Sequence, residues 1–224
     1  MEQLIHTFFN WPVFVESLPF LLDGFLVMIR IGFTSIVFGL LGGLFLALVK
    51  LYAPRPGKAL AQIYIDVYRS IPLLVYLFIV YYALPFVGIR LSAFWATTVA
   101  LGMVSSAYAA EIFRAGIEAV PKGQFEASSA LGLGFIDTMR DVVLPQAIKI
   151  VIPPMTGNCV NVLKDTALAS VVALPELLKQ AMQAQALAAN PTPLIGAAGL
   201  YLLLLWPLVR LVAYFERLYG AQKR

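Results

Sequence analysis

Long apolar stretches are the feature of this sequence that most limits how the chain can fold. A helix needs about 20 mostly apolar residues to cross the roughly 30 Å hydrocarbon core of a bilayer, and several stretches here are that long. Hydrophobic residues make up 61% of the chain and charged residues only 12%, whereas a soluble domain has about 25% charged residues. The sequence therefore predicts an all-α membrane protein with one transmembrane domain over residues 1–224.

About five helices are predicted to span the bilayer. Their approximate limits are residues 24–51, 63–84, 91–112, 151–174 and 193–215. Residues 1–23 mix aromatic with polar side chains and are predicted to lie along the outer leaflet, as an interfacial segment does. Residues 175–192 are predicted to form a short helix in an outer loop, stopped by Asn190 and Pro191.

The distribution of Lys and Arg predicts which side of the membrane each loop faces. Basic residues accumulate in short cytoplasmic loops, and two loops on one side hold only Arg90 and Lys179. The segments on the other side hold Lys50, Arg55, Lys58, Arg114, Lys122, Arg140, Lys149, Arg217, Lys223 and Arg224. We therefore expect the N-terminus outside and the C-terminus inside.

The longest predicted cytoplasmic interval covers residues 113–150. It contains QFEASSALGLG, which has the pattern of a short helix ended by glycine, and Pro145 leads into the fourth span. A structured loop of this length favours a binding partner.

The residue inventory argues against catalysis, metal binding and nucleic-acid binding. The single histidine, His6, is terminal, and no Gly-x-x-x-x-Gly-Lys-Ser/Thr phosphate loop occurs. No His, Cys, Asp or Glu cluster has metal-ligand spacing, and the lone Cys159 allows no intramolecular disulfide. The net charge of +4 arises from scattered basic residues, which suit lipid headgroups better than nucleic acid. The N-terminus lacks a basic segment and a cleavage site, so we expect no removable signal peptide.

Ionisable residues within apolar spans are the candidates for function, because burying a charge in hydrocarbon costs about 2.5 kcal/mol or more. Arg69 lies in the second span and either lines a substrate path or extends to the cytoplasmic interface. Asn158, Asn161 and Asp165 recur at helical spacing in the fourth span and share one face. This polar face either lines a wet cavity or forms interhelical hydrogen bonds.

Two further patterns have simpler structural interpretations. Glu111 and Arg114 are three residues apart near the end of the third span, where an ion pair within the helix is expected. Gly39 and Gly43 form a Gly-x-x-x-Gly pattern in the first span, which favours close helix packing either within one chain or between two.

The spacing within residues 113–150 resembles the EAA loop of ABC-importer permeases. The family pattern is Glu-Ala-Ala, three residues, Gly, nine residues, Ile, one residue, Leu-Pro. Here it is matched by Glu126, Ala127, Ser128, Gly132, Val142, Leu144 and Pro145, with Ser128 replacing alanine and Val142 replacing isoleucine. YRSIPLL, AYAAEIFRAGI, KGQFEA, LPQAI and LKDTALASV resemble the histidine/glutamine-type branch, which transports polar amino acids.

This resemblance implies the type I permease architecture and a function as the transmembrane subunit of an ATP-binding-cassette importer in a bacterial cytoplasmic (inner) membrane. Residues 113–150, called the coupling loop below, would dock in a cytoplasmic ATPase dimer that binds ATP and Mg. A second permease chain, identical or homologous, would complete the pathway, and an extracytoplasmic binding protein would deliver the amino acid. The chain itself would be no enzyme and would hold no cofactor.

The resemblance also yields a hypothesis for the substrate path. Family members with a site inside the membrane build part of it from the fourth span. Asp165 would meet the ammonium group of the amino acid, with Asn158 and Ser70 as polar neighbours.

Two other functions are compatible with the residues. A secondary transporter or channel could use Arg69 and Asp165 without an ATPase, although the EAA-like spacing argues against it. A membrane-anchoring subunit that transports nothing is also possible. The amino acid carried and the choice between homodimer and heterodimer are not readable from one sequence.

Overall fold

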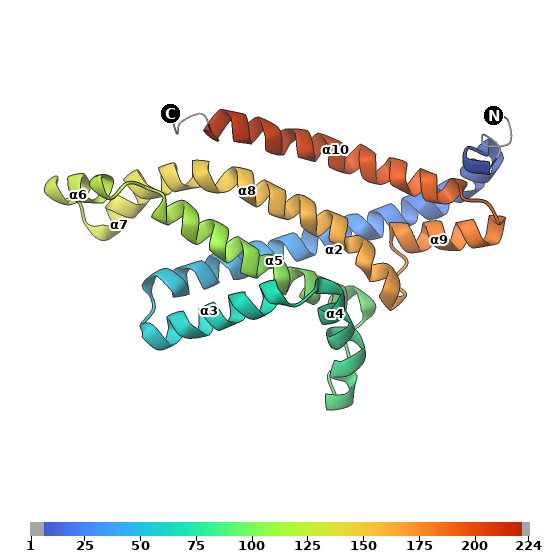
Figure 1. Ribbon diagram of the computed structural model, residues 1–224, viewed down its shortest axis with the longest axis horizontal. Helices are drawn as coiled ribbons and strands as arrows, with labels where there is room; N and C mark the ends of the chain where they lie inside the picture. Colours follow the sequence, from blue (N-terminus) through green and yellow to red (C-terminus); the bar gives the residue numbers. More distant parts are fainter. Residues whose placement is uncertain (1–6, 221–224) are drawn as a thin grey trace. The chain divides into compact units, whose positions relative to one another are not determined.

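The fold was examined in a computed structural model, which describes residues 7–220. His6, Lys223 and Arg224, which entered the sequence argument, lie outside these residues. The helices follow in the order α2 (Trp11–Tyr52), α3 (Arg55–Ser70), α4 (Leu73–Phe78), π-helical η1 (Ile79–Ala83), 3-10 helical η2 (Leu84–Val87), α5 (Ala93–Glu118), α6 (Lys122–Ala130), α7 (Phe135–Asp137), π-helical η3 (Thr138–Val143), α8 (Leu144–Asp165), 3-10 helical η4 (Thr166–Val172), α9 (Leu177–Ala188) and α10 (Thr192–Gly220) (Figure 1). The described residues contain no β-strand, as predicted for an all-α protein.

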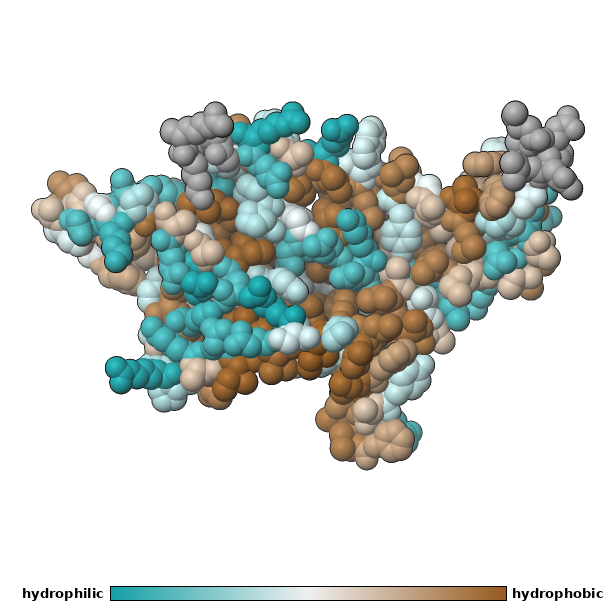
Figure 2. Space-filling model, in the orientation of Figure 1, coloured by the Kyte–Doolittle hydropathy of each residue, from teal (hydrophilic) through white to brown (hydrophobic). Residues whose placement is uncertain are grey.

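Three helices are long and apolar enough to cross a membrane, namely α2, α5 and α10. The predicted second span is a broken one, because α3 ends at Ser70 and a new helix starts at Leu73. Pro72 explains the break, since proline has no N–H and disfavours helical backbone in the residue before it. Figure 2 shows hydrophilic side chains along α3 and apolar ones over α4 to η2.

Helix boundaries differ from the predicted ones at several places. The expected interfacial segment is not separate in the backbone, because α2 continues through it as one helix of 42 residues. The fourth predicted span, 151–174, begins earlier, at Leu144, and its α-helical part ends at Asp165. Helix α8 is not among the helices of residues 7–220 that are long and apolar enough to cross a membrane, so a span at this position, and with it the total of about five, stays a prediction. The short helix predicted within residues 175–192 is present as α9, Leu177–Ala188, and its place on the outer side stays a prediction.

The chain packs as two compact units, each built from three separate segments. Unit 1 comprises the described parts of residues 1–38, 71–102 and 160–208, and unit 2 comprises those of 39–70, 103–159 and 209–224. Each unit has its own buried apolar clusters and is described by itself below.

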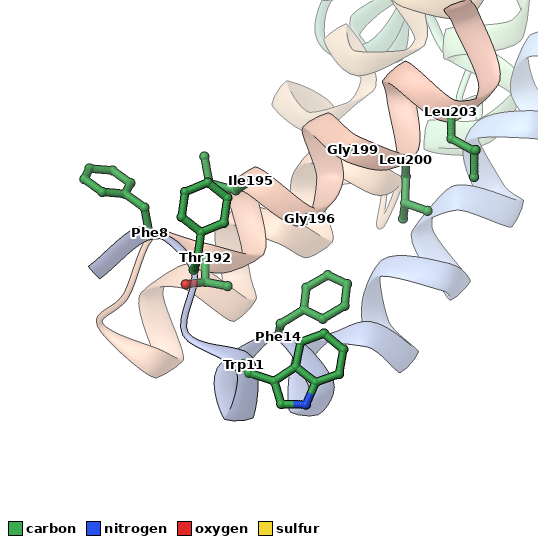
Figure 3. Close-up of a pocket in the computed structure, with 10 residues that line it drawn as sticks. Phe8, Trp11, Phe14, Thr192, Ile195, Gly196, Gly199, Leu200 and Leu203 are labelled. Carbon is green, nitrogen blue, oxygen red and sulfur yellow. The ribbon is translucent and has the colours of Figure 1, made fainter. Parts of the chain in front are cut away.

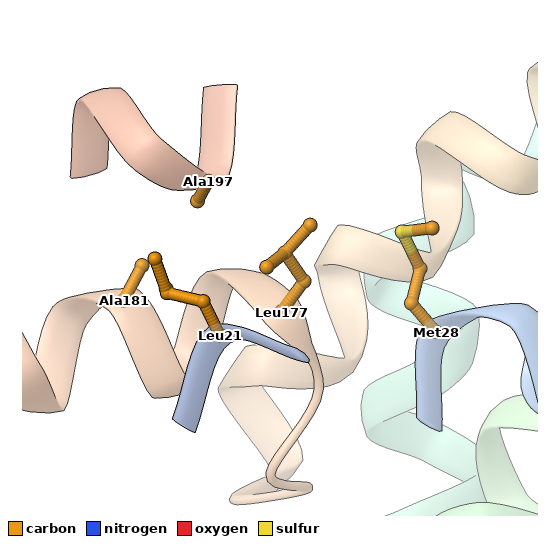
Figure 4. Close-up of a cluster of buried hydrophobic side chains, with 5 residues drawn as sticks. All are labelled: Leu21, Met28, Leu177, Ala181 and Ala197. Atoms are coloured by element: carbon orange, nitrogen blue, oxygen red, sulfur yellow. The ribbon is translucent and has the colours of Figure 1, made fainter. Parts of the chain in front are cut away.

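The main core of unit 1 joins the beginning of α2 to α9 and α10. Leu21, Met28, Leu177 and Ala181 are fully buried, and Ala197 of α10 is nearly so (Figure 4). Small residues allow close packing here, because a Cβ at Gly24 would lie 2.9 Å from the Cα of Leu177.

Unit 2 is held by close packing of the end of α2 against α5. A Cβ at Gly43 would lie 3.0 Å from both the amide nitrogen of Ala110 and the carbonyl oxygen of Ser106. Gly43 is therefore used for packing within one chain, which is one of the two interpretations of the Gly-x-x-x-Gly pattern. Helix α3 joins α5 through the Tyr64 hydroxyl, 2.9 Å from the hydroxyl of Ser106.

Candidate functional site

Helix α6 forms the exposed tip of the coupling loop and ends at a glycine, as the sequence predicted. Gly132 has φ of 76°, in the left-handed region that favours glycine. The N–H of Leu133 donates to the carbonyl of Ser128 at 3.1 Å, and that of Gly132 donates to Ser129 at 3.0 Å. These two bonds define a Schellman motif, which satisfies the last carbonyls of a helix and stops it. The end of α6 is therefore well defined.

The three residues of the Glu-Ala-Ser sequence point in different directions. Glu126 and Ala127 are exposed, whereas Ser128 is only 3% exposed. The Ser128 hydroxyl donates to the carbonyl of Gln124 at 2.7 Å, so the polar atom introduced in place of alanine is satisfied within α6. Ser128 thus replaces alanine without leaving an unpaired polar group, and Glu126 stays available at the surface.

A small apolar cluster fixes the coupling loop to the ends of α5 and α8. Val120, Val143 and Ala147 are buried together, and Phe125 of α6 and Met139 of η3 pack against them. Burial of a valine side chain such as Val120 or Val143 contributes about 1.5–3 kcal/mol. The loop is therefore a packed part of unit 2 rather than a free connection.

Pro145 explains the π-helical turn η3 that precedes it. Proline has no N–H to donate to the carbonyl four residues earlier, and its ring crowds that carbonyl. The chain takes a wider turn over Thr138–Val143 and continues into α8 from Leu144. Leu144 and Pro145 are both exposed. Such π-turns often occur at functional positions.

Large apolar side chains remain exposed on the coupling loop. Leu131 is 80% exposed, Phe135 63% and Ile136 76%. The loop also carries a charged pair, in which Arg140 Nε donates to Asp141 Oδ1 at 2.8 Å. This hydrogen bond holds the pKa of Asp141 below its usual value. An apolar surface with charges at its edge, on a segment predicted to face the cytoplasm, favours a protein partner.

A series of ion pairs joins α2 to α5 and continues along α5 into the first residues of the loop. Lys50 pairs with Glu111, Arg114 NH2 lies 2.6 Å from Glu111 Oε2, and Arg114 also pairs with Glu118. The expected pair between Glu111 and Arg114 is therefore confirmed. The sequence argument missed Lys50 as its third member, since residues 61 positions apart give no periodic signal.

The predicted substrate-path residues on α8 differ in their surroundings. Asn158 Nδ2 donates to Ser105 Oγ at 3.0 Å, which is the interhelical bond considered as the alternative to a cavity. Asn161 is exposed. Asp165 is half-buried at the end of α8, and no hydrogen bond joins its carboxylate to another described residue.

Arg69 and Ser70 are the last two residues of α3, and both are exposed. The Arg69 guanidinium carbon lies 5.3 Å from the centre of the Tyr108 ring, a distance typical of a cation–π interaction. Both side chains belong to unit 2. The Tyr108 ring therefore positions the Arg69 guanidinium at the end of α3.

Glu176 is a buried acid that sequence reasoning did not single out. Its carboxylate accepts from the backbone N–H groups of Leu178 at 2.9 Å and Lys179 at 2.7 Å, and so caps α9. The hydroxyl of Tyr201 donates to the same carboxylate at 3.3 Å. Glu176 is fully buried, and burial raises its pKa, while the three hydrogen bonds act in the opposite direction. An acidic residue just before a helix was the available signal.

A groove of about 440 Å³ in unit 1 does not suit a polar substrate. Aromatic side chains from residues 8–14 face the first turns of α10, and Figure 3 shows Trp11 and Phe14 on one side and Ile195 on the other. The hydroxyl of Thr192 already accepts the backbone N–H of Asn10 at 3.0 Å. With apolar walls and an engaged hydroxyl, the groove offers an amino acid no charged partner. Over residues 7–220, no three His, Cys, Asp or Glu side chains form a possible metal site.

Comparisons with known proteins agree with this geometry. Residues 39–220 match the family described as binding-protein-dependent transport system inner membrane component. The arginine transport system permease protein ArtQ of Bacillus subtilis (strain 168) is 38% identical over 192 residues, covering 85% of this chain and 88% of that protein. A putative glutamine transport system permease protein GlnP of Rickettsia bellii (strain RML369-C) is 35% identical over 207 residues, covering 92% and 93% of the two chains.

Solved structures show the same fold. A chain from a crystal structure of an amino acid ABC transporter with histidines superposes with a TM-score of 0.84 at 38% identity, covering 91% of this chain and 95% of that one. A chain of the inward-facing MetNI methionine ABC transporter superposes with a TM-score of 0.73 at 22% identity, covering 92% and 98%, which shows the fold alone. The fold and the coupling loop define a type I ABC-importer permease. This chain belongs to the binding-protein-dependent transport system inner membrane component family.

Proposed function

We propose that this chain is the permease subunit of an ATP-driven importer that moves a polar amino acid across a bacterial inner membrane. The observation that supports this most strongly is the coupling loop, in which matched spacing, a defined helix end and an exposed carboxylate occur together. Relatives named for arginine and glutamine transport support an amino acid as the substrate.

The coupling loop is the docking surface for the ATPase in this proposal. Helix α6 presents Glu126 to a basic group of the partner, with exposed Leu131 and Ile136 as apolar contacts. ATP and Mg bind in that partner. Hydrolysis reaches the substrate through conformation alone, by alternating access, because ATP binds in the partner ATPase whereas the substrate binds in the permease.

A second permease chain and lipid cover the apolar surface that one chain leaves exposed. The most apolar part of α10 has a mean hydropathy of 1.9, yet only 6% of it is buried against the rest of the chain. An extracytoplasmic binding protein delivers the amino acid on the opposite side, where α9 is predicted to lie.

Asp165 is the proposed contact for the ammonium group of the substrate. It is half-buried, and no other described side chain hydrogen-bonds to it, so its carboxylate is available. We assign Asn158 a secondary role, because its side-chain amide is already bonded to Ser105. Ser70, Arg69 and Asn161 remain candidates from the sequence, each with an exposed side chain.

The test is reconstitution of the complete transporter in vesicles. The chain is combined with the ATPase and any second permease encoded beside it, and ATP hydrolysis is measured with and without the binding protein and a panel of amino acids. We expect one loaded binding protein to stimulate hydrolysis and uptake. Amino-acid flux that follows an imposed ion gradient, with no associated ATPase, would refute the proposal in favour of a secondary transporter.

A further inference from the structure

The C-terminal end of α2 makes two contacts of different chemistry, one with α5 and one with the coupling loop. Lys50 pairs with Glu111 of α5, and the side chains of these two residues are only 17% and 21% exposed. Two residues further along, the Tyr52 ring meets the Phe135 ring edge-on, with centroids 5.7 Å apart. All of these residues lie in unit 2.

The ion pair of Lys50 and Glu111 belongs to a series of ion pairs that runs along α5 toward the tip of the coupling loop. Glu111, Arg114 and Glu118 lie on one face of α5, at spacings of three and four residues. Just after these residues in the sequence, Val120 belongs to the buried cluster that packs the coupling loop against the ends of α5 and α8. Arg114 is shared between Glu111 and Glu118. Lys50 supplies the second positive charge and neutralises Glu111, the more buried of the two carboxylates.

Because the backbones of α2 and α5 lie close together, the ion pair between Lys50 and Glu111 acts mainly against sliding of one helix along the other. Gly43 brings α2 and α5 so near that a Cβ would lie 3.0 Å from the backbone of α5. Such close contact shows that the two helices touch through their backbones, but small residues alone provide no polar group that fixes their position along the helix axes. An ion pair at one end resists such sliding, since displacement by one turn, about 5.4 Å, would separate the charges.

We infer that Lys50 and Glu111 are positioning residues that make the end of α2 move together with the coupling loop when the ATPase moves it. Within unit 2, helix α2 runs without a break from Gly39 to Tyr52, so a displacement at its end reaches this part of the helix. Neither residue touches substrate or nucleotide. The inference rests on the proposed function, because it assigns a path for the movement that hydrolysis causes.

The experiment uses the complete transporter in vesicles and measures amino acid taken up per ATP hydrolysed. The wild-type complex comes first, because a lack of stimulation by loaded binding protein there would refute the proposed function itself. Lys50→Met removes the charge while keeping an apolar side chain. Lys50→Arg keeps the charge, and Lys58→Met makes the same substitution at an exposed lysine outside the coupling loop, whose side chain donates to the carbonyl of Leu51 and not to a carboxylate.

We expect Lys50→Met to lower uptake per ATP by at least roughly fivefold, the low end of typical coupling between sites. Lys50→Arg and Lys58→Met should stay close to wild type. Uptake per ATP that is unchanged in Lys50→Met would overturn the inference while leaving the proposed function intact. An equal loss in Lys58→Met would also overturn it, since that result would mean that removing a lysine charge near this end of α2 has the same effect without the pair to Glu111.

A second measurement decides the question even if Lys50→Met does not assemble. Spin labels are placed on exposed Leu48 of α2 and Ala115 of α5 in a chain that keeps Lys50 and carries Cys159→Ala. We expect the distance between the labels to be the same in the nucleotide-free and ATP-trapped states. A distance that changes on trapping would show that α2 slides along α5, and the inference would be wrong.

Discussion

The N–H of Leu133 donates to the carbonyl of Ser128 across Gly132, and this bond sets where α6 ends. Gly132→Val places a β-branched residue at φ of 76° and costs about 1–2 kcal/mol of local strain. We expect uptake to fall while membrane insertion stays normal, because the end of α6 is displaced. Gly132→Asn is the matched control, since asparagine tolerates this backbone conformation. Equal uptake in the two variants would contradict the prediction.

Glu126 is exposed on α6, and its carboxylate forms no hydrogen bond or ion pair with another residue of 7–220. Glu126→Lys reverses its charge and should repel a basic groove in the ATPase, so we expect uptake to be lost and the ATPase to be absent after purification in mild detergent. Asp137→Lys is a comparable reversal on the same loop outside α6 and should weaken binding less. Retention of the ATPase by Glu126→Lys would argue against docking through α6.

Asp165→Asn keeps the size of the side chain and removes its charge. If the carboxylate meets the substrate ammonium, the substrate concentration for half-maximal uptake should rise, with basal ATP hydrolysis little changed. Charge-assisted hydrogen bonds contribute about 1.5–3 kcal/mol, which corresponds to roughly tenfold or more. Exposed Asn161→Asp is the comparison on the same helix. Normal uptake and normal stimulated hydrolysis in Asp165→Asn would remove Asp165 from the substrate path.

Glu176 should make stability depend on pH. Its pKa is raised in the folded protein, whereas an unfolded glutamate has a pKa of about 4.3. Between these two values the folded state binds more protons, so stability decreases as pH rises through this window. Glu176→Gln should flatten that dependence, measured by thermal unfolding in detergent. Exposed Glu16→Gln should retain it, and an unchanged slope in Glu176→Gln would contradict the prediction.

Gly43→Ala and Gly199→Ala add the same methyl group to two helices in different surroundings. A Cβ at Gly43 meets the backbone of α5, whereas one at Gly199 meets nothing within 4 Å. Overpacking costs about 1–3 kcal/mol, and the helix preference of alanine over glycine offsets up to about 1 kcal/mol. We expect a lower melting temperature for Gly43→Ala and an equal or higher one for Gly199→Ala. The reverse order would show that the packing is not tight at Gly43.

Much of the coupling loop was predictable, because its features depend on neighbours along the chain. The glycine that ends α6 and the short helix before it follow from local backbone preferences, and both are confirmed. The limits of the spans were less predictable. The early start of α8 and the break before Leu73 depend on proline geometry that hydropathy does not record.

The sequence by itself determined the membrane class, the all-α fold and the family, since hydropathy and motif spacing are properties of contiguous residues. Only the tertiary structure decided which polar groups are satisfied and by what. It paired Asn158 with Ser105 and Lys50 with Glu111, and it placed Glu176 under Tyr201. The paired residues are 53, 61 and 25 positions apart and come from different helices, so each pair depends on how closely those helices pack.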